Sequence, residues 1–382
     1  MIMAAVAALA HFYLWRRLVR DTTAPGGRGR RWGTVALAGA YLMMVVALLF
    51  AAELTVVAWP GYLWLAMMFY LTILMGILEI PRVLLLRRAK APVLVGTAAQ
   101  EPDKPESPSR RVFISRSFAL AGGLTAGGIV GYGATQALGD PRVTSIPVTL
   151  GKLDPALSGF RIAVVSDIHL GPLRGRSHTE RIVRMINEQQ PDLVAIVGDL
   201  VDGTVDKLGE AAAPLRDLVS KHGSFFVTGN HEYYSGFEPW LTELERLDVN
   251  PLRNERVAIQ RGGAAFDLAG VNDVTGRNFN DAPDFERTLA GRDATRPVVL
   301  LAHQPVQVEQ AAKHGVDLQL SGHTHGGQMF PFHAIIPVQQ PVVAGLEKID
   351  DTWIYVTRGA GFWGPPVRVG ASPEISMIQL ST

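Results

Sequence analysis

Long apolar runs and short basic segments alternate along the first third of the chain. Residues 34–59 and 61–80 are each long enough to cross the roughly 30 Å hydrocarbon core of a bilayer, which takes about 20 helical residues. A shorter run, residues 1–15, has arginines after it and none before it, whereas a cleaved secretory signal carries its basic residues first. The pattern predicts a transmembrane helical region over residues 1–90 with three helices, the first of marginal length.

A proline-glycine pair, Pro60-Gly61, separates the two long runs and predicts a tight turn between them. The two runs would then form a helical hairpin. Glu53 and Glu79 lie near the predicted ends of these helices. Carboxylates at helix ends favour a position among the lipid headgroups over a proton or ion path through the membrane.

A polar, proline-rich segment comes next and predicts a flexible cytoplasmic linker over residues 91–111. The apolar run that follows, residues 112–138, is long enough to form a fourth transmembrane helix. Its start, with Arg110-Arg111 before the apolar stretch, also resembles a twin-arginine export signal, although such signals are normally N-terminal. Both alternatives, a membrane helix and a twin-arginine-like signal anchor, send the following domain outward.

The distribution of Lys and Arg indicates the orientation in the membrane, because short basic loops resist translocation. Basic residues gather in 16–31 and 82–111, and both segments are therefore predicted to be cytoplasmic. Residues 140–382 would then lie on the extracytoplasmic side of a multi-pass protein of the cell membrane. About ten residues join the last helix to this domain and reach at most roughly 35 Å, so the domain is expected to work near the bilayer.

From residue 140 onward, short β-branched apolar runs alternate with helical patterns. Continuous apolar runs of this kind predict strands that are buried on both faces. The predicted strands are 160–166, 192–197, 224–228, 264–269, 298–302, 318–320, 353–357 and 374–380, and the predicted helices are 180–189, 207–220 and 239–247. We therefore expect one α/β domain over residues 140–382, with two packed sheets flanked by helices.

Charge divides the chain in the same way as hydropathy. Residues 1–139 hold 14 Lys and Arg against 6 Asp and Glu, a balance of +8, and residues 140–382 have a balance of −7, which leaves the net +1. A mildly acidic globular part argues against nucleic acid as the main partner. Cysteine is absent, which excludes disulfides, thiolate catalysis and cysteine-based zinc sites.

Aspartate, asparagine and histidine gather where the predicted strands end. The clusters are Asp167-Ile168-His169, Gly198-Asp199-Leu200-Val201-Asp202, Gly229-Asn230-His231-Glu232, His303 and Gly322-His323-Thr324-His325. Each cluster alone has a plain alternative as a turn or a surface histidine. Together they supply the oxygen and imidazole ligands for two divalent metal ions about 3.5–4 Å apart, which can make hydroxide from a shared water for attack on a phosphate ester.

In these motifs the chain resembles the calcineurin-like metallophosphoesterases, and more closely their membrane-anchored bacterial branch, over residues 158–382. The resemblance implies a four-layer α/β/β/α sandwich of two mixed sheets with a dinuclear metal site. It also implies two sets of metal ligands bridged by Asp199. The first set is Asp167, His169 and His325, and the second set is Asn230, His303 and His323.

His231 is implied to be catalytic and not a ligand. It would donate a proton to the leaving oxygen or steady the phosphate, while Asp202 keeps its imidazole protonated and oriented. Asp202 stands where the purple acid phosphatases have a tyrosine ligand, which disfavours the ferric-tyrosinate subtype. The ligand set suits two divalent ions of Mn, Fe, Zn or Co without selecting among them.

Other histidines and one apolar loop have weaker signals. His178, His222 and His314 fall on predicted helices or adjoining loops and are expected at the surface. The apolar loop 329–337 follows the His323-His325 pair and has two interpretations. It is either a connection packed against the domain or an exposed lip that helps to admit a lipid-like substrate.

The sequence therefore predicts a membrane-tethered, metal-dependent phosphoesterase, and more specifically a phosphodiesterase acting near the outer membrane surface. A lipid headgroup, a lipid-linked wall precursor or an envelope polymer is the expected class of substrate. The alternative is a catalytically silent, metal-binding sensor or scaffold of the same fold. Loss of a ligand would favour that alternative, and the sequence retains all seven predicted ligands. The oligomeric state has no signal in the sequence.

Overall fold

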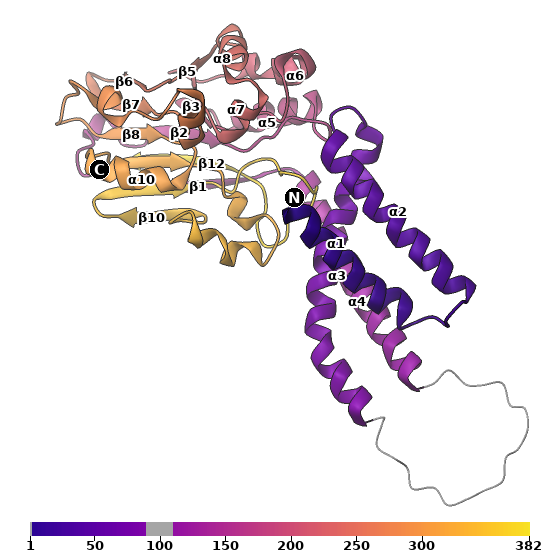
Figure 1. Ribbon diagram of the computed structural model, residues 1–382. Coiled ribbons are helices and arrows are strands. Elements are labelled where there is room, and N and C mark those ends of the chain that lie inside the picture. The colour runs from indigo at the N-terminus through magenta and orange to yellow at the C-terminus, as the bar shows by residue number, and fades with distance from the viewer. Residues whose placement is uncertain (1, 89–109) are drawn as a thin grey trace, which may run out of the picture. The chain divides into compact units, whose positions relative to one another are not determined.

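The computed structural model of the protein describes residues 2–88 and 110–382 and divides the chain into two compact units (Figure 1). The first unit is Met1–Tyr132 and the second is Gly133–Thr382. Most of the predicted linker, residues 91–109, lies outside the described residues.

Helices make up the first unit. They are α1 (Ile2–Leu14), a π-helical segment (Trp15–Arg20), α2 (Arg28–Phe50), α3 (Thr55–Arg88) and α4 (Arg110–Leu138), whose last turns belong to the second unit. In the described part of the chain, three helices are long and apolar enough to cross a membrane: Arg28–Phe50, Thr55–Arg87 and Arg110–Leu138. α1 has 13 residues, fewer than the roughly 20 that a crossing takes.

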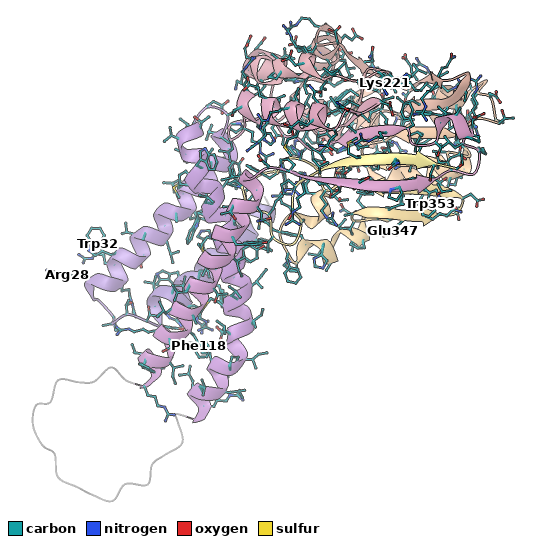
Figure 2. All side chains as sticks on the ribbon, turned by 180° about the vertical axis from the view of Figure 1, so that it is seen from behind. Arg28, Trp32, Phe118, Lys221, Glu347 and Trp353 are labelled. Atoms are coloured by element: carbon teal, nitrogen blue, oxygen red, sulfur yellow. The ribbon has the colours of Figure 1, made fainter. Side chains whose placement is uncertain are left out.

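Basic and aromatic residues mark the first turns of α2. Arg28 and Trp32 project away from the helix (Figure 2), and the Trp32 side chain is exposed. Arginine and tryptophan at the end of an apolar helix are typical of the membrane–water interface, where both side chains reach the lipid headgroups. The same end of α2 follows the basic loop that the sequence predicts to be cytoplasmic.

The predicted turn at Pro60-Gly61 is wrong, because both residues lie inside α3 and the chain turns at residues 51–54 instead. A Cβ on Gly61 would clash with the Cβ of Ala47 and would lie 3.0 Å from the carbonyl oxygen of Met43 in α2. Gly61 therefore permits the close approach of two packed helices, a role that small residues have in membrane bundles. A long apolar helix tolerates the loss of the backbone hydrogen bond that Pro60 cannot donate.

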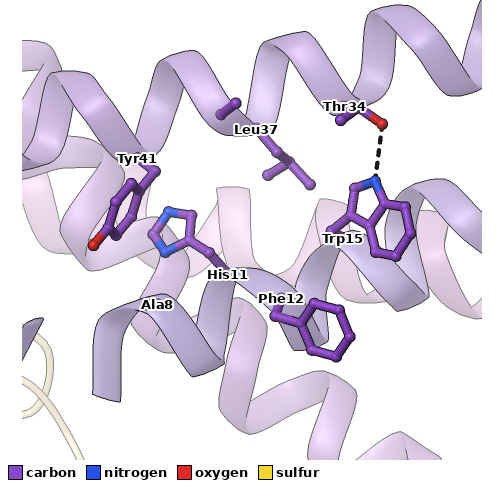
Figure 3. Close-up of a pocket in the computed structure, with 8 residues that line it drawn as sticks. Ala8, His11, Phe12, Trp15, Thr34, Leu37 and Tyr41 are labelled. Atoms are coloured by element: carbon purple, nitrogen blue, oxygen red, sulfur yellow. Dashed lines mark hydrogen bonds between the residues drawn. The ribbon is translucent and has the colours of Figure 1, made fainter. Parts of the chain in front are cut away.

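An open pocket of about 450 Å³ lies between α1 and α2 (Figure 3). Its lining is mainly apolar, and Trp15 Nε1 donates a hydrogen bond to Thr34 Oγ1 at its rim. His11 also lines it, but Trp64 Nε1 donates to His11 Nε2 at 2.9 Å and His11 Nδ1 lies 2.8 Å from the Ala7 carbonyl. Because both ring nitrogens are already bonded, His11 is a structural residue of the helix bundle.

Two six-stranded mixed sheets form the second unit (Figure 1). The first sheet has the order β1-β12-β2-β3-β4-β5 and the second has the order β10-β11-β9-β8-β7-β6. The strands are β1 (Arg142–Thr149), β2 (Arg161–Val165), β3 (Leu193–Val197), β4 (Ser224–Val227), β5 (Val249–Pro251), β6 (Glu255–Arg261), β7 (Ala264–Gly270), β8 (Val298–Leu301), β9 (Leu318–Ser321), β10 (Gly345–Ile349), β11 (Thr352–Val356) and β12 (Glu374–Ser381).

Alternating side chains divide this unit into layers. In β2, Ile162 and Val164 belong to the core between the two sheets, whereas Ala163 and Val165 pack against the helices on the outer face. The helices of that outer face are α5 (Arg176–Glu188), α6 (Val205–Ala212) and α8 (Phe237–Arg246), and those of the opposite face are α9 (Phe285–Leu289) and α10 (Val308–Lys313). The predicted four-layer α/β/β/α sandwich is confirmed.

The structure adds four strands to the predicted ones: β1, β5, β6 and β10. β1 and β10 are edge strands whose side chains are largely exposed or half-buried, so they lack the continuous apolar run that marks a central strand. The predicted helix 207–220 ends early, at Ala212, and continues as a 3-10 turn that contains Pro214. Proline lacks the backbone donor that the helix would need there.

Candidate metal centre

Five strand ends meet at the predicted site. Asp167 follows β2, Asp199 follows β3 and Asn230 follows β4 in the first sheet, while His303 follows β8 and His323 follows β9 in the second. The three strands of the first sheet are parallel, as are the two of the second. Their carboxyl ends therefore open at one edge of each sheet, which is where open α/β sheets carry ligands.

Backbone conformation sets the predicted ligands apart. Five of the seven have a positive φ, between 50° and 71°: Asp167, His169, Asp199, His323 and His325. Residues other than glycine rarely adopt this backbone conformation, although Asp and His tolerate it better than most. Strained backbone concentrates at functional sites, where the surrounding structure holds it in place.

Glycines let the ligand loops approach one another. A Cβ on Gly229 would clash with Asp199, and a Cβ on Gly322 would clash with Ser166 and Asp167. These glycines immediately precede Asn230 and His323. The Gly-Asn-His and Gly-His motifs therefore exist because only glycine fits where two ligand-bearing loops touch.

The first group of ligand atoms comes from Asp167, His169 and His325, which all lie within 4.8 Å of one another. His325 Nε2 is 3.3 Å from Asp167 Oδ1 and 3.1 Å from His169 Nε2. The backbone N–H of His323 donates to both carboxylate oxygens of Asp167, at 3.0 and 3.1 Å, and so fixes that carboxylate. This group coincides with the set predicted for one metal ion.

The second group comes from Asp199, His303 and His323, again within 4.8 Å of one another. Asp199 Oδ2 lies 3.2 Å from His303 Nε2 and 3.8 Å from His169 Nε2, so one carboxylate oxygen stands between both groups. One buried atom here, Asn230 Oδ1, has no hydrogen-bond partner within residues 2–88 and 110–382. Buried polar atoms are normally bonded, and this oxygen is therefore available to a ligand.

Charge and burial keep two of the histidines neutral. Burial, together with the charge of His303, lowers the pKa of His323 to about 3. Burial likewise holds the pKa of His325 well below its usual range, with His169 and Arg368 adding to the effect. Neutral imidazole is the form that binds a metal ion.

Asp202 lies between two histidines. Its Oδ1 is 2.7 Å from His231 Nδ1 and 2.9 Å from His169 Nδ1. Burial alone would raise the pKa of Asp202, but the charge of His169 and the bonds to both histidines hold it well below its usual range. Burial would likewise lower the pKa of His231, yet the hydrogen bond to Asp202 and the charge of Asp199 raise it to about 9.

His231 also belongs to a compact group with Asp199 and His169. Its Nδ1 is already paired with Asp202, so only Nε2 is left to exchange a proton with a substrate. The ring is partly exposed, and the exposed rings of Tyr234 and Trp363 lie 5.6 and 6.1 Å from it between centroids. A substrate can therefore reach His231 from solvent.

Glu232 is a buried residue to which the sequence assigned no role. Its Oε2 accepts hydrogen bonds from the N–H groups of Gly229 and Asp199, at 2.6 and 2.9 Å, and its Oε1 accepts from those of Leu200 and Val201, at 2.8 and 3.3 Å. One carboxylate thus ties the loop of Asn230 to the loop of Asp199. The available signal was its place three residues after Gly229, the capping-box position at the start of α7 (Asn230–Ser235).

Two buried arginines were also missed, because arginine is ordinarily a surface residue. Arg368 is fully buried and donates to the carbonyl oxygens of Gly361 and Ala371, and its Nη2 lies 3.1 Å from His325 Nδ1. Arg174 donates to the carbonyl of Ile168 at 2.9 Å. Both arginines fix backbone beside predicted ligands, and no local pattern in the sequence marks them.

One expectation about the remaining histidines is wrong. His178 is buried in α5 and is not at the surface, since Arg181 lies 3.1 Å from its Nδ1 and the helix packs against the 3-10 turn (Ala213–Asp217). His222 and His314 are half-buried; His222 lies tilted against Phe160, and His314 stacks on Phe285. None of the three lies in the groups of ligand atoms found in the described residues.

The donor set fits divalent metal ions. It combines carboxylate and amide oxygens with imidazole nitrogens, which suits Mn, Fe, Zn and Co. One carboxylate stands between the two groups, as a bridging ligand must. Beside them, His231 carries a proton that its Nε2 can donate to an oxygen.

The sequence matches a family model and several known proteins. A family model described as calcineurin-like phosphoesterase matches residues 160–327. An uncharacterised metallophosphoesterase of Helicobacter pylori is 41% identical over 276 residues, which are 72% of this chain and 73% of that protein. A Danio rerio transmembrane protein with a metallophosphoesterase domain is 39% identical over 65% of this chain and 59% of its own length. An uncharacterised metallophosphoesterase of Bacillus subtilis is 32% identical over 72% of this chain and 98% of its own length.

Among solved structures, the similarity is low. The phosphopantetheinyl hydrolase of Mycobacterium tuberculosis gives a TM-score of 0.33 at 12% identity, over 54% of this chain and 91% of that one. A 5'-nucleotidase precursor of Thermus thermophilus gives 0.36 at 14% identity, over 58% of this chain and 54% of that one. At these scores the likeness carries no argument about function.

Proposed function

The chain belongs to the calcineurin-like metallophosphoesterase family, and on that premise we propose that it is a membrane-tethered phosphodiesterase that uses two divalent metal ions. Membership in this family supports an activity as a metal-dependent phosphoester hydrolase. The number of ions, the preference for a diester and the side of the membrane are proposed in addition.

One observation carries the proposal for two ions. Two groups of ligand atoms share the region around Asp199, and Asn230 Oδ1 is buried beside it without a partner in the described chain. A buried acceptor without a partner costs about 1–3 kcal/mol, so such atoms persist where a ligand satisfies them. We assign Asp167, His169 and His325 to one ion, Asn230, His303 and His323 to the other, and Asp199 to both.

Bound there, two ions would supply an activated water and neutralise charge on the phosphoryl group. The chain's own residues do the rest. His231 donates its Nε2 proton to the leaving oxygen. Asp202 accepts the N–H of the other ring nitrogen, Nδ1, and stabilises the doubly protonated ring, so that Nε2 also carries a proton. Because Asp202 also bonds His169, it aligns the proton donor with a metal ligand.

A diester is the preferred substrate in this proposal, because it carries two organic groups on the phosphate. The exposed rings of Tyr234 and Trp363 flank His231 and offer an aromatic surface to such groups. A diester can contact more of this surface than a monoester, which has only its leaving group.

The substrate is proposed to lie at the membrane. α4 ends at Leu138 and β1 begins at Arg142, so the connection is shorter than the sequence suggested and reaches roughly 15 Å. The basic loops support a position of the domain on the extracytoplasmic side of the cell membrane, whether or not α1 crosses the membrane. A lipid-linked or other envelope phosphate ester is therefore the substrate class we propose.

The full chain in detergent tests the proposal. We expect metal analysis to give two divalent ions per chain and the protein to hydrolyse bis(p-nitrophenyl) phosphate once Mn²⁺ or Zn²⁺ is added. Loss of hydrolysis on chelation and its return with metal would support the assignment. Two bound ions without hydrolysis of any ester would instead favour a sensor or scaffold, and hydrolysis that survives chelation would overturn the metal chemistry.

A further inference from the structure

An exposed apolar surface borders the candidate metal centre. It consists of residues 330–338 and Trp363, and we refer to it as the apolar lip. Val338, Ile335, Trp363 and Phe330 are 82%, 60%, 59% and 57% exposed, whereas Met329 just before them is buried. The alternative of a connection packed against the domain is therefore wrong.

The composition of the lip is unusual for a loop in water. Residues 326–346 contain no Asp, Glu, Lys or Arg. Of the large apolar side chains that are exposed in the second unit, half lie in these two short segments. A contiguous exposed apolar surface of this kind marks an interaction site.

Hydrogen bonds hold the two segments of the lip together. Gln328 Nε2 donates to the carbonyl of Trp363 at 2.8 Å, and the Trp363 N–H donates to Gln328 Oε1 at 2.9 Å. The Phe330 N–H donates to the carbonyl of Val369 at 2.9 Å. The lip is therefore a built surface that presents its apolar side chains in a fixed arrangement.

The lip is continuous with the candidate metal centre. Trp363 lies edge-on to His231, with 6.1 Å between ring centroids. His325, a predicted ligand, precedes Gly326-Gly327, and the backbone of His333 lies so close to Gly327 that a Cβ there would clash. A molecule resting on the lip would thus have its polar end beside His231.

The same segment that carries Trp363 is bonded to the last turns of α4, all within the second unit. The Arg368 N–H donates to the carbonyl of Gly133 at 2.9 Å, and Ser372 Oγ donates to Gln136 Oε1 at 3.2 Å. A Cβ on Gly133 would clash with Val367 and Val369. Since α4 is a candidate membrane span, the lip is attached to the end of a membrane helix.

We propose that the apolar lip docks into the interface of a lipid bilayer and presents phosphate esters of membrane lipids to the metal centre. The attachment to α4 favours a bilayer over a soluble protein or a second copy of the chain, because the end of that helix leads the lip to the membrane surface. Phe330, Ile335 and Val338 enter the region below the headgroups, and Trp363 lies at headgroup level, as tryptophan prefers. The substrate class rests on the proposed function, whereas the docking does not.

Spin labels in the full chain test the docking directly. Because the protein has no cysteine, Val338→Cys and Ile335→Cys each give a single labelling site, and Val219→Cys gives a matched exposed site outside the lip. In vesicles of phosphatidylethanolamine and phosphatidylglycerol, nitroxides at 335 and 338 should collide with oxygen more often, and with a water-soluble nickel complex less often, than one at 219. Equal accessibility at all three positions would overturn the proposal, as would shielding of 335 and 338 by self-association in detergent.

A pair of substrates tests the consequence for catalysis. The double variant Ile335→Asp/Val338→Asp should hydrolyse a long-chain alkyl p-nitrophenyl phosphodiester in those vesicles about tenfold more slowly, since aspartate resists insertion, and the methyl analogue in water at the wild-type rate. Val219→Asp should leave both rates unchanged. Equal rates on the long-chain ester, or a matching loss on the methyl ester, would overturn the role of the lip. A wild-type protein inactive on both esters would refute the proposed function and leave the label result standing.

Discussion

Two clusters of charged side chains, one in each unit, are built in opposite ways. In the helical unit, Arg82 donates to Asp21 at 2.8 Å and to Glu79 at 3.2 Å, Arg17 donates to Asp21 at 2.7 Å, and Arg17 also pairs with Glu79. Tyr13 donates to Glu79 as well. The two acids and the arginines of this cluster thus satisfy one another.

The cluster at the strand ends is incomplete by comparison. Its carboxylates lie beside imidazoles on strained backbone, and Asn230 Oδ1 lacks a partner in the part of the chain described. Charge in apolar surroundings is common to both clusters, so charge alone does not indicate function. Buried polar atoms without a hydrogen-bond partner and a strained backbone do indicate function, because folding alone does not compensate for their cost in free energy. We expect changes in the first cluster to affect stability and changes in the second to affect chemistry.

The largest effect should come from the shared carboxylate. Asp199→Asn removes one charge from both predicted ions, and a loss of several kcal/mol of transition-state stabilisation corresponds to about 1000-fold in kcat. Metal content per chain should fall in the same variant. Asp248→Asn is a matched control, since Asp248 is an exposed aspartate with a similar φ of 58°. An Asp199→Asn variant that retains both ions and full activity would contradict the contrast between the two clusters.

The proton donor should come next. His231→Ala should lower kcat on bis(p-nitrophenyl) phosphate about 100-fold, the usual contribution of a general acid, and leave metal content unchanged. The wild-type rate should fall as pH rises through the pKa of His231, which bound cations would shift below about 9, because the proton needed for donation is lost.

In His231→Ala this descending limb of the pH profile should disappear. His222→Ala, at a half-buried histidine outside the site, should match the wild type in both rate and pH profile. A descending limb that persists in the alanine variant would assign the proton to another group.

The carboxylate that ties two ligand loops together should have a smaller effect. Glu232→Gln turns one acceptor oxygen into a donor facing two backbone N–H groups, and the displaced loops should weaken metal binding about tenfold, as expected for a residue that orients ligands. Metal titration should show activity recovering at higher metal concentration, with kcat near the wild-type value at saturation. Glu238→Gln, an exposed glutamate in the first turn of α8, should change neither quantity.

The smallest effect on chemistry should follow a change in the other cluster. Asp21→Asn leaves Arg17 and Arg82 without their shared carboxylate, and breaking a buried ion pair costs about 3 kcal/mol of stability. The thermal midpoint of the full chain in detergent should drop by several degrees, while kcat stays within about twofold of the wild type. Arg31→Gln, at an exposed arginine of α2, should leave the midpoint unchanged. A tenfold fall in kcat in Asp21→Asn would contradict the contrast between the clusters.

Local pattern determined a large part of this protein. Continuous β-branched runs such as residues 193–197 identify central strands, and Gly-Asp, Gly-Asn-His and His-x-His identify ligand loops, because both depend on neighbouring residues and on side-chain chemistry. The four-layer fold and the family could therefore be predicted. Edge strands such as β1 could not, since the sheet covers only part of each and their sequence carries no matching run.

Tertiary structure decided which groups share a partner. Asp202 bonds both His169 and His231, Glu232 bonds the loop of Asp199, and Arg368 lies beside His325, and each contact depends on how distant loops meet at the sheet edges. It also decided that Gly61 lies at a helix contact and that residues 330–338 are exposed. Residue type states which atoms can bind, but burial and pairing arise from long-range packing, which no local stretch of the sequence encodes.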